Sequence, residues 1–127
     1  MAVEMTTPGA AGWIEFSGPN AAEAKKFYAD VMGWTINDMP MEDGSSYTGL
    51  LVGDEAIGGV SPMPADAGSW TIYVTVPDVD SATEKARKAG ATITAAPFDA
   101  PGVGRISKII DPQGASIAMI TYESMQA

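Results

Sequence analysis

Bulky apolar and polar residues alternate along several short stretches of the chain, as expected of β-strands that are buried on one face. The clearest stretch is residues 70–76 (WTIYVTV). Because successive side chains of a strand point to opposite faces, Ile72 and Val74 share one face, which we expect a helix to cover. Thr71 and Tyr73 share the other face, which is the more polar of the two.

Two other stretches have the apolar spacing and the end signals of α-helices. In the first, Asn20 is the predicted N-cap, Glu23 is its capping-box partner, and Gly33 is the predicted terminator. Phe27 and Tyr28 lie on the apolar face of this helix. We therefore assign both aromatic residues to the core.

The second helical stretch follows Asp78 or Asp80, either of which has the side chain of an N-cap, and ends at Gly90. Each helix follows one predicted strand and precedes three others. The strands are predicted over residues 12–17, 34–37, 46–52, 56–61, 70–76, 91–96, 105–110 and 115–122, with turns at 42–45, 53–55 and 111–114 and a loop at 98–104.

The order strand–helix–strand–strand–strand therefore occurs twice, and aligning Asn20 with Asp78 superimposes the two copies. We expect an α+β fold built from two tandem βαβββ modules, about residues 12–64 and 69–122, within a single domain over residues 12–122. Residues 1–11 are predicted to form a leader and residues 123–127 a tail. A chain of 127 residues suits one domain.

The amino-acid composition excludes several kinds of metal site and catalytic residue and disfavours some classes of partner. Sixteen acidic against seven basic residues give a formal charge of −9, which disfavours nucleic-acid and membrane-surface partners. The absence of cysteine and histidine excludes disulfides, thiolate and imidazole metal ligands, and histidine-dependent catalytic triads. The start of the chain has no features of a signal peptide, so we expect a cytoplasmic protein.

Three segments together resemble the vicinal oxygen chelate superfamily, also called the glyoxalase/bleomycin resistance/dioxygenase superfamily. They are residues 20–34 (NAAEAKKFYADVMGW), 78–90 (DVDSATEKARKAG) and 111–115 (DPQGA). The resemblance covers about residues 12 to 122. A metal-poor, glyoxalase-like branch of the superfamily is resembled by residues 13–15 (WIE), 101–105 (PGVGR), and Tyr47 together with residues 58–60 (GGV). The resemblance implies that the modules form a curved mixed sheet, a half-barrel, around a cavity, and that the protein is a homodimer.

Metal-dependent members of this superfamily carry metal ligands at four positions. The resemblance transfers these positions to Trp13, Thr71, Ala118 and one residue within 58–61 (GGVS). A divalent metal needs several oxygen or nitrogen donors around one point, which these residues do not supply. We therefore expect neither a metal nor another cofactor.

Two charged residues are the strongest candidates for ligand recognition. Glu15 alternates with apolar neighbours and is expected to point into the cavity, where it could bind a cation or an amine or act as a general base. Arg105 follows a glycine-rich turn and could bind a carboxylate or a phosphate. The structural alternative for Glu15 is an ion pair within the chain, for example with Arg105. For Arg105 the alternative is a place at the surface or that same pair.

The remaining candidates are neutral side chains that could line the cavity and stack on a ring-shaped ligand. The complete set of predicted ligand-binding residues is Trp13, Glu15, Tyr47, Thr71, Tyr73, Arg105 and Ala118.

These residues favour a metal-independent protein that holds an apolar or aromatic small molecule in the sheet cavity. One alternative is a metal-free lyase or isomerase in which Glu15 is the general base and Arg105 or Tyr73 polarises a substrate oxygen. Another is an interaction module in which Trp13, Tyr73 and Met119 fill the cavity.

Overall fold

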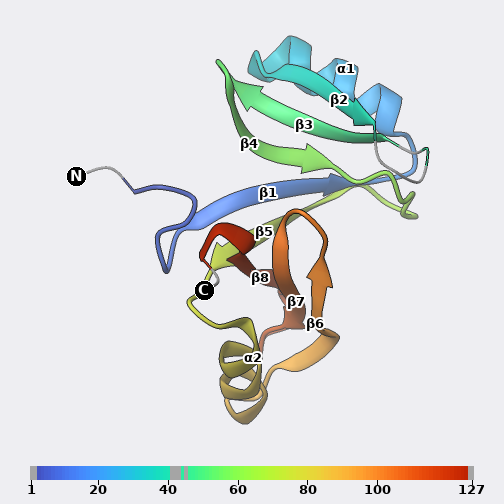
Figure 1. Cartoon of the computed structure of the whole chain (residues 1–127). Helices are drawn as coiled ribbons and strands as arrows, with labels where there is room; N and C mark the ends of the chain where they lie inside the picture. The colour runs from blue at the N-terminus through green and yellow to red at the C-terminus, as the bar shows by residue number, and fades with distance from the viewer. Residues whose placement is uncertain (1–2, 41–43, 45, 126–127) are drawn as a thin grey trace. The chain divides into compact units, whose positions relative to one another are not determined.

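The computed structural model describes residues 3–40, 44 and 46–125 (Figure 1). Contacts divide the chain into two compact units. The N-terminal unit is Trp13–Thr71, and the C-terminal unit joins the described residues of Met1–Gly12 to those of Ile72–Ala127. The chain passes from one unit to the other within β1 (Ala11–Ser17) and again within β5 (Ser69–Thr75).

The N-terminal unit contains α1 (Ala21–Met32), β2 (Thr35–Pro40), β3 (Ser46–Val52) and β4 (Glu55–Val60). Its strands lie in the order β2-β3-β4-β1. β1 and β4 are parallel, whereas β3 is antiparallel to both of its neighbours. The predicted strand at residues 46–52 is confirmed at both ends.

The C-terminal unit repeats this arrangement. It contains α2 (Val79–Lys88), β6 (Thr92–Ala100), β7 (Gly104–Ile110), β8 (Ser116–Tyr122) and a short 3-10 helix, η1 (Glu123–Met125). β5 and β8 are parallel, and β8, β7 and β6 are successively antiparallel. The predicted α+β class and the repeated βαβββ order, with mixed strand directions, are therefore confirmed.

Capping side chains determine where the helices begin. The Asn20 side chain accepts a hydrogen bond from the Glu23 backbone N–H at 3.0 Å, and Gly33 ends α1 with a φ of 76°. Asp78, rather than Asp80, caps α2, because its carboxylate accepts from the Asp80 backbone N–H at 3.0 Å. Neither helix in the described part of the chain is long and apolar enough to cross a membrane.

α2 packs against one face of its sheet through buried polar and apolar contacts. Val79 and Thr83 are almost fully buried, and the Thr83 hydroxyl lies 2.8 Å from that of Ser107 on β7. Ser107 pairs in register with Met119, which pairs with Val74. The expected orientation of Val74 toward a helix is confirmed, whereas Met119 faces α2 rather than the cavity side of the sheet.

The opposite face of this sheet carries Tyr73 and Ala118, which are paired in register. Both are buried, with exposed fractions of 5% and 0%. Ile72 is less buried than expected, because 43% of its surface is exposed. Alternation thus predicted the direction of these side chains but not the depth of their burial.

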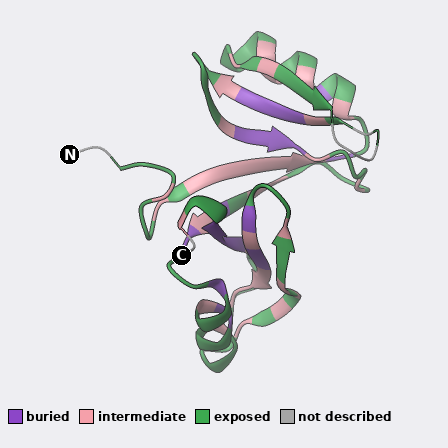
Figure 2. Ribbon diagram, in the orientation of Figure 1, coloured by how far each residue is buried: buried purple, intermediate pink, exposed green. Residues whose placement is uncertain are grey.

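In the N-terminal unit, β3 and β4 carry runs of buried residues (Figure 2). The same unit contains a cluster of partly buried aromatic side chains. Tyr28 contacts the rings of Phe16, Trp34 and Trp70, and the Trp70 indole donates a hydrogen bond to the Tyr28 hydroxyl at 3.2 Å. The core assignment of Tyr28 agrees with these contacts. The core assignment of Phe27 is wrong, because 54% of its surface is exposed.

Some predicted boundaries also differ from the structure. Strand β6 extends to Ala100 with two register irregularities, so Phe98 lies in a strand and not in a loop. The predicted turn at 111–114 is confirmed, since the Asp111 carboxylate accepts hydrogen bonds from the backbone of Gln113 and Ala115. The predicted turn at 42–45 lies outside the described residues except for Gly44.

The described residues of the leader are attached to β5. The Gly9 backbone N–H donates to the Thr75 carbonyl, and the Thr75 backbone N–H donates to the Ala10 carbonyl, both at 2.8 Å. The Thr75 hydroxyl also donates to the Met5 carbonyl. This segment is therefore hydrogen-bonded to the last residue of β5 rather than lying loose.

Candidate functional site

The N-terminal unit brings together three of the predicted ligand-binding residues, Trp13, Glu15 and Tyr47. The Tyr47 hydroxyl, on β3, donates to a carboxylate oxygen of Glu15, on β1, at 3.5 Å. β4 lies between these two strands, and its Gly59 is in register with Glu15. The Tyr47 side chain therefore reaches over β4 to meet Glu15, and both side chains are only partly buried.

The surroundings of Tyr47 keep its hydroxyl protonated. Burial and, next, the negative charge of Glu15 raise the pKa of Tyr47 to about 12, although a hydrogen bond with Trp13 acts in the opposite direction. At neutral pH the phenol is thus a hydrogen-bond donor beside a carboxylate acceptor. Trp13, Glu15 and Tyr47 together offer an aromatic ring, an acceptor and a donor on one face of the sheet.

Three other predicted residues lie on β5 and β8. Tyr73 and Ala118 are neighbours, as expected, but both are buried. Thr71 is only partly buried and, by alternation, is on the same face of β5 as Tyr73. A ligand could reach Tyr73 or Ala118 only if the atoms that cover them moved.

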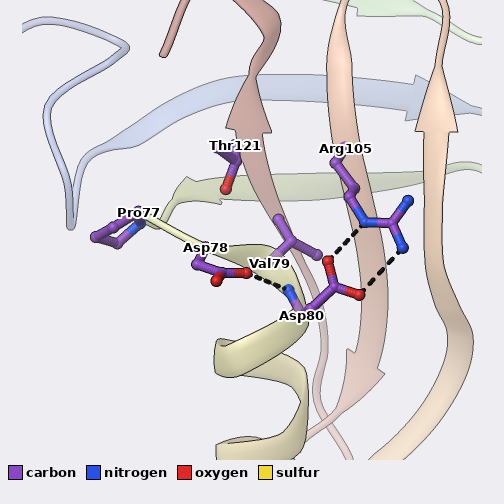
Figure 3. Close-up of a pocket in the computed structure, with 6 residues that line it drawn as sticks. All are labelled: Pro77, Asp78, Val79, Asp80, Arg105 and Thr121. Atoms are coloured by element: carbon purple, nitrogen blue, oxygen red, sulfur yellow. Dashed lines mark hydrogen bonds and ion pairs between the residues drawn. The ribbon is translucent and has the colours of Figure 1, made fainter. Parts of the chain in front are cut away.

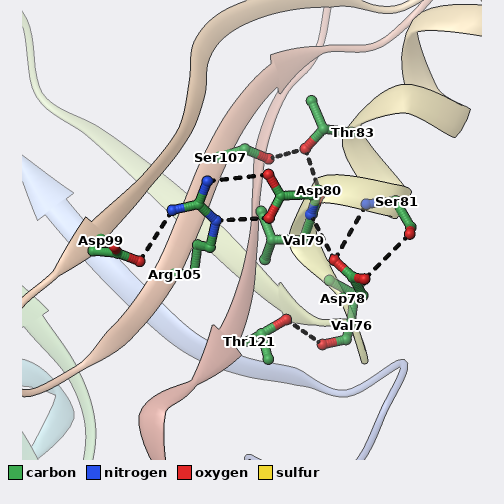
Figure 4. Close-up of polar contacts among 10 residues, drawn as sticks. All are labelled: Val76, Asp78, Val79, Asp80, Ser81, Thr83, Asp99, Arg105, Ser107 and Thr121. Carbon is green, nitrogen blue, oxygen red and sulfur yellow. Dashed lines mark hydrogen bonds and ion pairs between the residues drawn. The ribbon is translucent and has the colours of Figure 1, made fainter. Parts of the chain in front are cut away.

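Arg105 is held by acidic residues of its own unit (Figure 4). Its Nε and Nη2 donate to the two carboxylate oxygens of Asp80 at 2.6 and 3.0 Å, and its Nη1 donates to Asp99 at 3.1 Å. These hydrogen bonds raise the pKa of Arg105. The structure gives Arg105 two aspartate partners within its own unit, so a ligand carboxylate would have to compete with both of them.

Arg105 also lines a shallow pocket of about 220 Å³ at the start of α2 (Figure 3). Its other polar side chains are engaged as well: Asp78 caps the helix, and the Thr121 hydroxyl donates to the Val76 carbonyl. Each polar group here has a structural partner, so the pocket is explained by the attachment of α2 to the sheet. Its lining residues are Pro77, Asp78, Val79, Asp80, Arg105 and Thr121.

The four positions to which the resemblance assigns metal ligands do not fit a metal ion. The Trp13 indole hydrogen-bonds to Tyr47, and Ala118 offers only a buried methyl group. Thr71 has a hydroxyl but no carboxylate, and residues 58–61 (GGVS) contain no carboxylate either. Among the residues that the structure describes, no three His, Cys, Asp or Glu side chains are grouped so as to hold a metal ion.

The sequence analysis did not predict the roles of Gly59 and Asp80, although Gly59 lies within the segment 58–61 to which the resemblance transfers a metal-ligand position. Gly59 belongs to a glycine pair inside a strand, a pattern that often marks the close approach of another group. Asp80 was considered only as a helix cap. Its role as the partner of Arg105 depends on how α2 is placed beside β7, which has no local signal in the sequence.

Comparison with known proteins identifies relatives over most of the chain. "Putative glyoxylase CFP32" of Mycobacterium tuberculosis is 32% identical over 117 residues, covering 87% of this chain and 45% of that protein. "Anthracycline biosynthesis protein DnrV" of Streptomyces peucetius is 26% identical over 128 residues, covering 88% and 46%. The chain thus spans a little under half the length of these relatives.

Solved structures of the same fold include methylmalonyl-CoA epimerase from Mycobacterium tuberculosis, with a TM-score of 0.60, 15% identity, and coverage of 94% of this chain and 91% of that chain. A mutant 4-hydroxymandelate synthase from Streptomyces coelicolor has a TM-score of 0.65 and 18% identity, covering 91% and 39%. At such identities the likeness shows the fold alone. Residues 10–119 match the model of the Glyoxalase/Bleomycin resistance protein/Dioxygenase superfamily, and the chain therefore belongs to that superfamily.

Proposed function

We propose that this chain is a metal-independent small-molecule-binding protein whose ligand lies on Trp13, Glu15 and Tyr47. The observation that carries the proposal is the hydrogen bond from Tyr47 to Glu15 beside the Trp13 ring, on a face that is only partly buried. Binding sites for small molecules commonly combine aromatic surface with a few polar groups that point to one place.

The chemistry of these three side chains favours an aromatic ligand that carries a protonated amine. A carboxylate accepts charge-assisted hydrogen bonds from an ammonium group. An indole face attracts both aromatic rings and cations. The Tyr47 hydroxyl has one proton, which it donates to Glu15. When an ammonium group of the ligand takes over the Glu15 carboxylate, this proton becomes available for a neutral oxygen of the same ligand, and the raised pKa of Tyr47 keeps the proton in place.

The names of the relatives, a glyoxylase and an anthracycline biosynthesis protein, support a role in small-molecule chemistry. The lack of a metal-binding group of side chains among the described residues supports metal independence. We also propose that the protein is a homodimer, as its resemblance to the superfamily implies. Native mass spectrometry of the purified protein would report its mass, any co-purified ligand and any bound metal together.

The proposal is tested with three compounds that share an indole ring but differ in charge: tryptamine, tryptophol and indole-3-acetate. We expect tryptamine to bind best. Replacing Glu15 with Gln should lower the affinity for tryptamine by about tenfold or more, since hydrogen bonds to charged groups contribute roughly 1.5–3 kcal/mol. Isothermal titration calorimetry after treatment with a metal chelator gives the affinities.

The matched control is Glu55→Gln, because Glu55 is an exposed carboxylate at the start of β4 in the same unit. This variant should bind all three compounds as the wild type does. Equal affinity for the three compounds, an unchanged affinity in Glu15→Gln, or binding that requires an added divalent metal would contradict the proposal.

A second function is favoured by the same pair of residues. A carboxylate next to a phenol that stays protonated can remove a proton from carbon while the phenol donates to the substrate oxygen, as in a metal-free lyase or isomerase. Arg105 is poorly suited to donate to the substrate oxygen, because it is already paired with two aspartates. Tyr47 fits that role better than Tyr73, since it contacts Glu15.

The two functions are separated by proton exchange. Indole-3-pyruvate has acidic methylene protons, and their exchange with deuterated solvent is followed by NMR. An enzyme of this type should accelerate the exchange, and Glu15→Gln should abolish the acceleration while leaving indole-3-pyruvate bound. A binding protein should leave the exchange rate unchanged.

A further inference from the structure

We propose that Gly59 is a positioning residue for the Glu15–Tyr47 pair, because the absence of a side chain there leaves the space that the end of the Tyr47 side chain occupies. The inference rests on the proposed function for its meaning in ligand binding. The placement of Tyr47 itself can be tested without any ligand.

Gly59 lies between the two partners on the middle strand. It is in register with Glu15 of β1 on one side and with Gly49 of β3 on the other. A Cβ atom built on Gly59 would lie 1.9 Å from the Tyr47 hydroxyl oxygen and 2.4 Å from Cζ of the same ring. No side chain larger than hydrogen at position 59 is therefore compatible with Tyr47 in its present place.

Space, and not backbone conformation, is what this glycine provides. Gly59 does not have the positive φ that would itself require glycine, so alanine can adopt the same backbone conformation. The clash of an added Cβ is with the far end of the Tyr47 side chain. Rotation of that side chain can relieve the clash without moving the strands.

The neighbouring glycines provide a contrast. A Cβ on Gly58 would lie 2.3 Å from the backbone oxygen of Ile14, so alanine there would disturb the pairing of β4 with β1. A Cβ on Gly49 would have its nearest contact at 3.4 Å, with the Leu51 side chain, which is an ordinary contact distance. Gly49→Ala is thus a matched control for Gly59→Ala.

The consequence for the site follows from the pair itself. With alanine at position 59, the Tyr47 hydroxyl must leave its place beside Glu15. The face then loses the donor that is paired with the carboxylate, and Tyr47 moves away from the negative charge that raises its pKa. We expect Gly59→Ala to bind the three indole compounds with less selectivity. We also expect it to lower the pKa of Tyr47, a change that can be measured without any ligand.

The experiment follows Tyr47 by NMR of protein labelled with carbon-13 at tyrosine Cζ, with Tyr47→Phe used to assign the signal. In the wild type, the Tyr47 ring should show contacts with the Gly59 α-protons, and its titration should begin only at strongly alkaline pH. In Gly59→Ala, we expect the pKa to fall from about 12 toward the ordinary value of 10.0. Gly49→Ala should behave as the wild type.

If Gly59→Ala folds poorly, the proposal can still be tested by making the same substitution in a variant that lacks the Tyr47 ring. In a Tyr47→Ala chain the ring is absent, so adding Gly59→Ala should leave the melting temperature nearly unchanged. The proposal is overturned if the Tyr47 titration in Gly59→Ala equals that of the wild type, or if Gly59→Ala is equally damaging in both backgrounds.

Failure of this inference can be told apart from failure of the proposed function. If Gly59→Ala alters the Tyr47 signal but tryptamine binds neither protein, the positioning role stands and the ligand assignment fails. If tryptamine binds the wild type and its affinity depends on Glu15, but Gly59→Ala changes neither tryptamine binding nor the Tyr47 signal, the ligand assignment stands and the positioning role fails.

Discussion

The Tyr47 hydroxyl lies 3.5 Å from a carboxylate oxygen of Glu15, a residue 32 positions earlier in the chain. The charge of Glu15 is the second cause, after burial, of the raised pKa of Tyr47. We therefore expect Glu15→Gln to lower this pKa from about 12 while leaving it above 10.0, because Tyr47 stays partly buried. Carbon-13 NMR of labelled tyrosine measures the change, and Glu55→Gln should leave the pKa as it is.

The raised pKa of Tyr47 also predicts how the stability of the protein changes at alkaline pH. The pKa of Tyr47 is higher in the folded protein than in the unfolded chain, so the folded state binds its proton more tightly. The resulting stability is fully present below about pH 10 and is lost as pH rises toward about 12. Urea unfolding across this range should show a decline that is smaller in Tyr47→Phe. An equally steep decline in both proteins would assign it to other groups.

Arg105 joins α2 to β6 through Asp80 and Asp99. We expect Arg105→Met to lower the free energy of unfolding at neutral pH and low salt, and the difference to shrink at high salt, since exposed charges are screened. Arg87→Met is the control, because Arg87 pairs with Glu84 within one helix and both side chains are more than half exposed. This control should have little effect on urea unfolding.

The ion pair between Arg105 and Asp80 also predicts how the stability of the protein changes at acidic pH. Hydrogen bonds from Arg105 lower the pKa of Asp80 below 3.8 in the folded protein. The stabilisation is therefore present above pH 3.8 and is lost as pH falls through the lowered pKa. Wild type and Arg105→Met should become more alike in stability over this acidic range. A constant difference between them would mean that packing of the arginine side chain, and not its charge, was lost.

The buried hydroxyls of Thr83 and Ser107 form a pair that can be tested by a double-mutant cycle. Thr83 donates to the Val79 carbonyl at 2.6 Å, so Ser107 must supply the proton of the 2.8 Å contact between the hydroxyls. Thr83→Val removes the acceptor and leaves the Ser107 hydroxyl buried, which costs about 1–3 kcal/mol. Urea unfolding should show that adding Ser107→Ala recovers part of this loss, and additive effects would mean that the residues are not coupled.

The repeated order of elements could be read from the sequence because its signals are local. A strand such as β3 has alternating side chains between turn residues, and α1 begins at a capping Asn20 and ends at Gly33. The superfamily could be recognised for the same reason, since its motifs follow one another along the chain. Local preferences of this kind act within a few residues and need no knowledge of the folded neighbours.

Tertiary structure alone decided which side chains meet. Glu15 and Tyr47 were both candidates, but their contact depends on the register of three strands and on the empty space at Gly59. Arg105 was assigned a ligand or Glu15, whereas the position of α2 gives it Asp80. The amino-acid sequence by itself determined the elements and the chemistry available to this protein. The partners of each group were decided by pairing and packing between distant segments, because a side chain's contacts depend on where those segments lie.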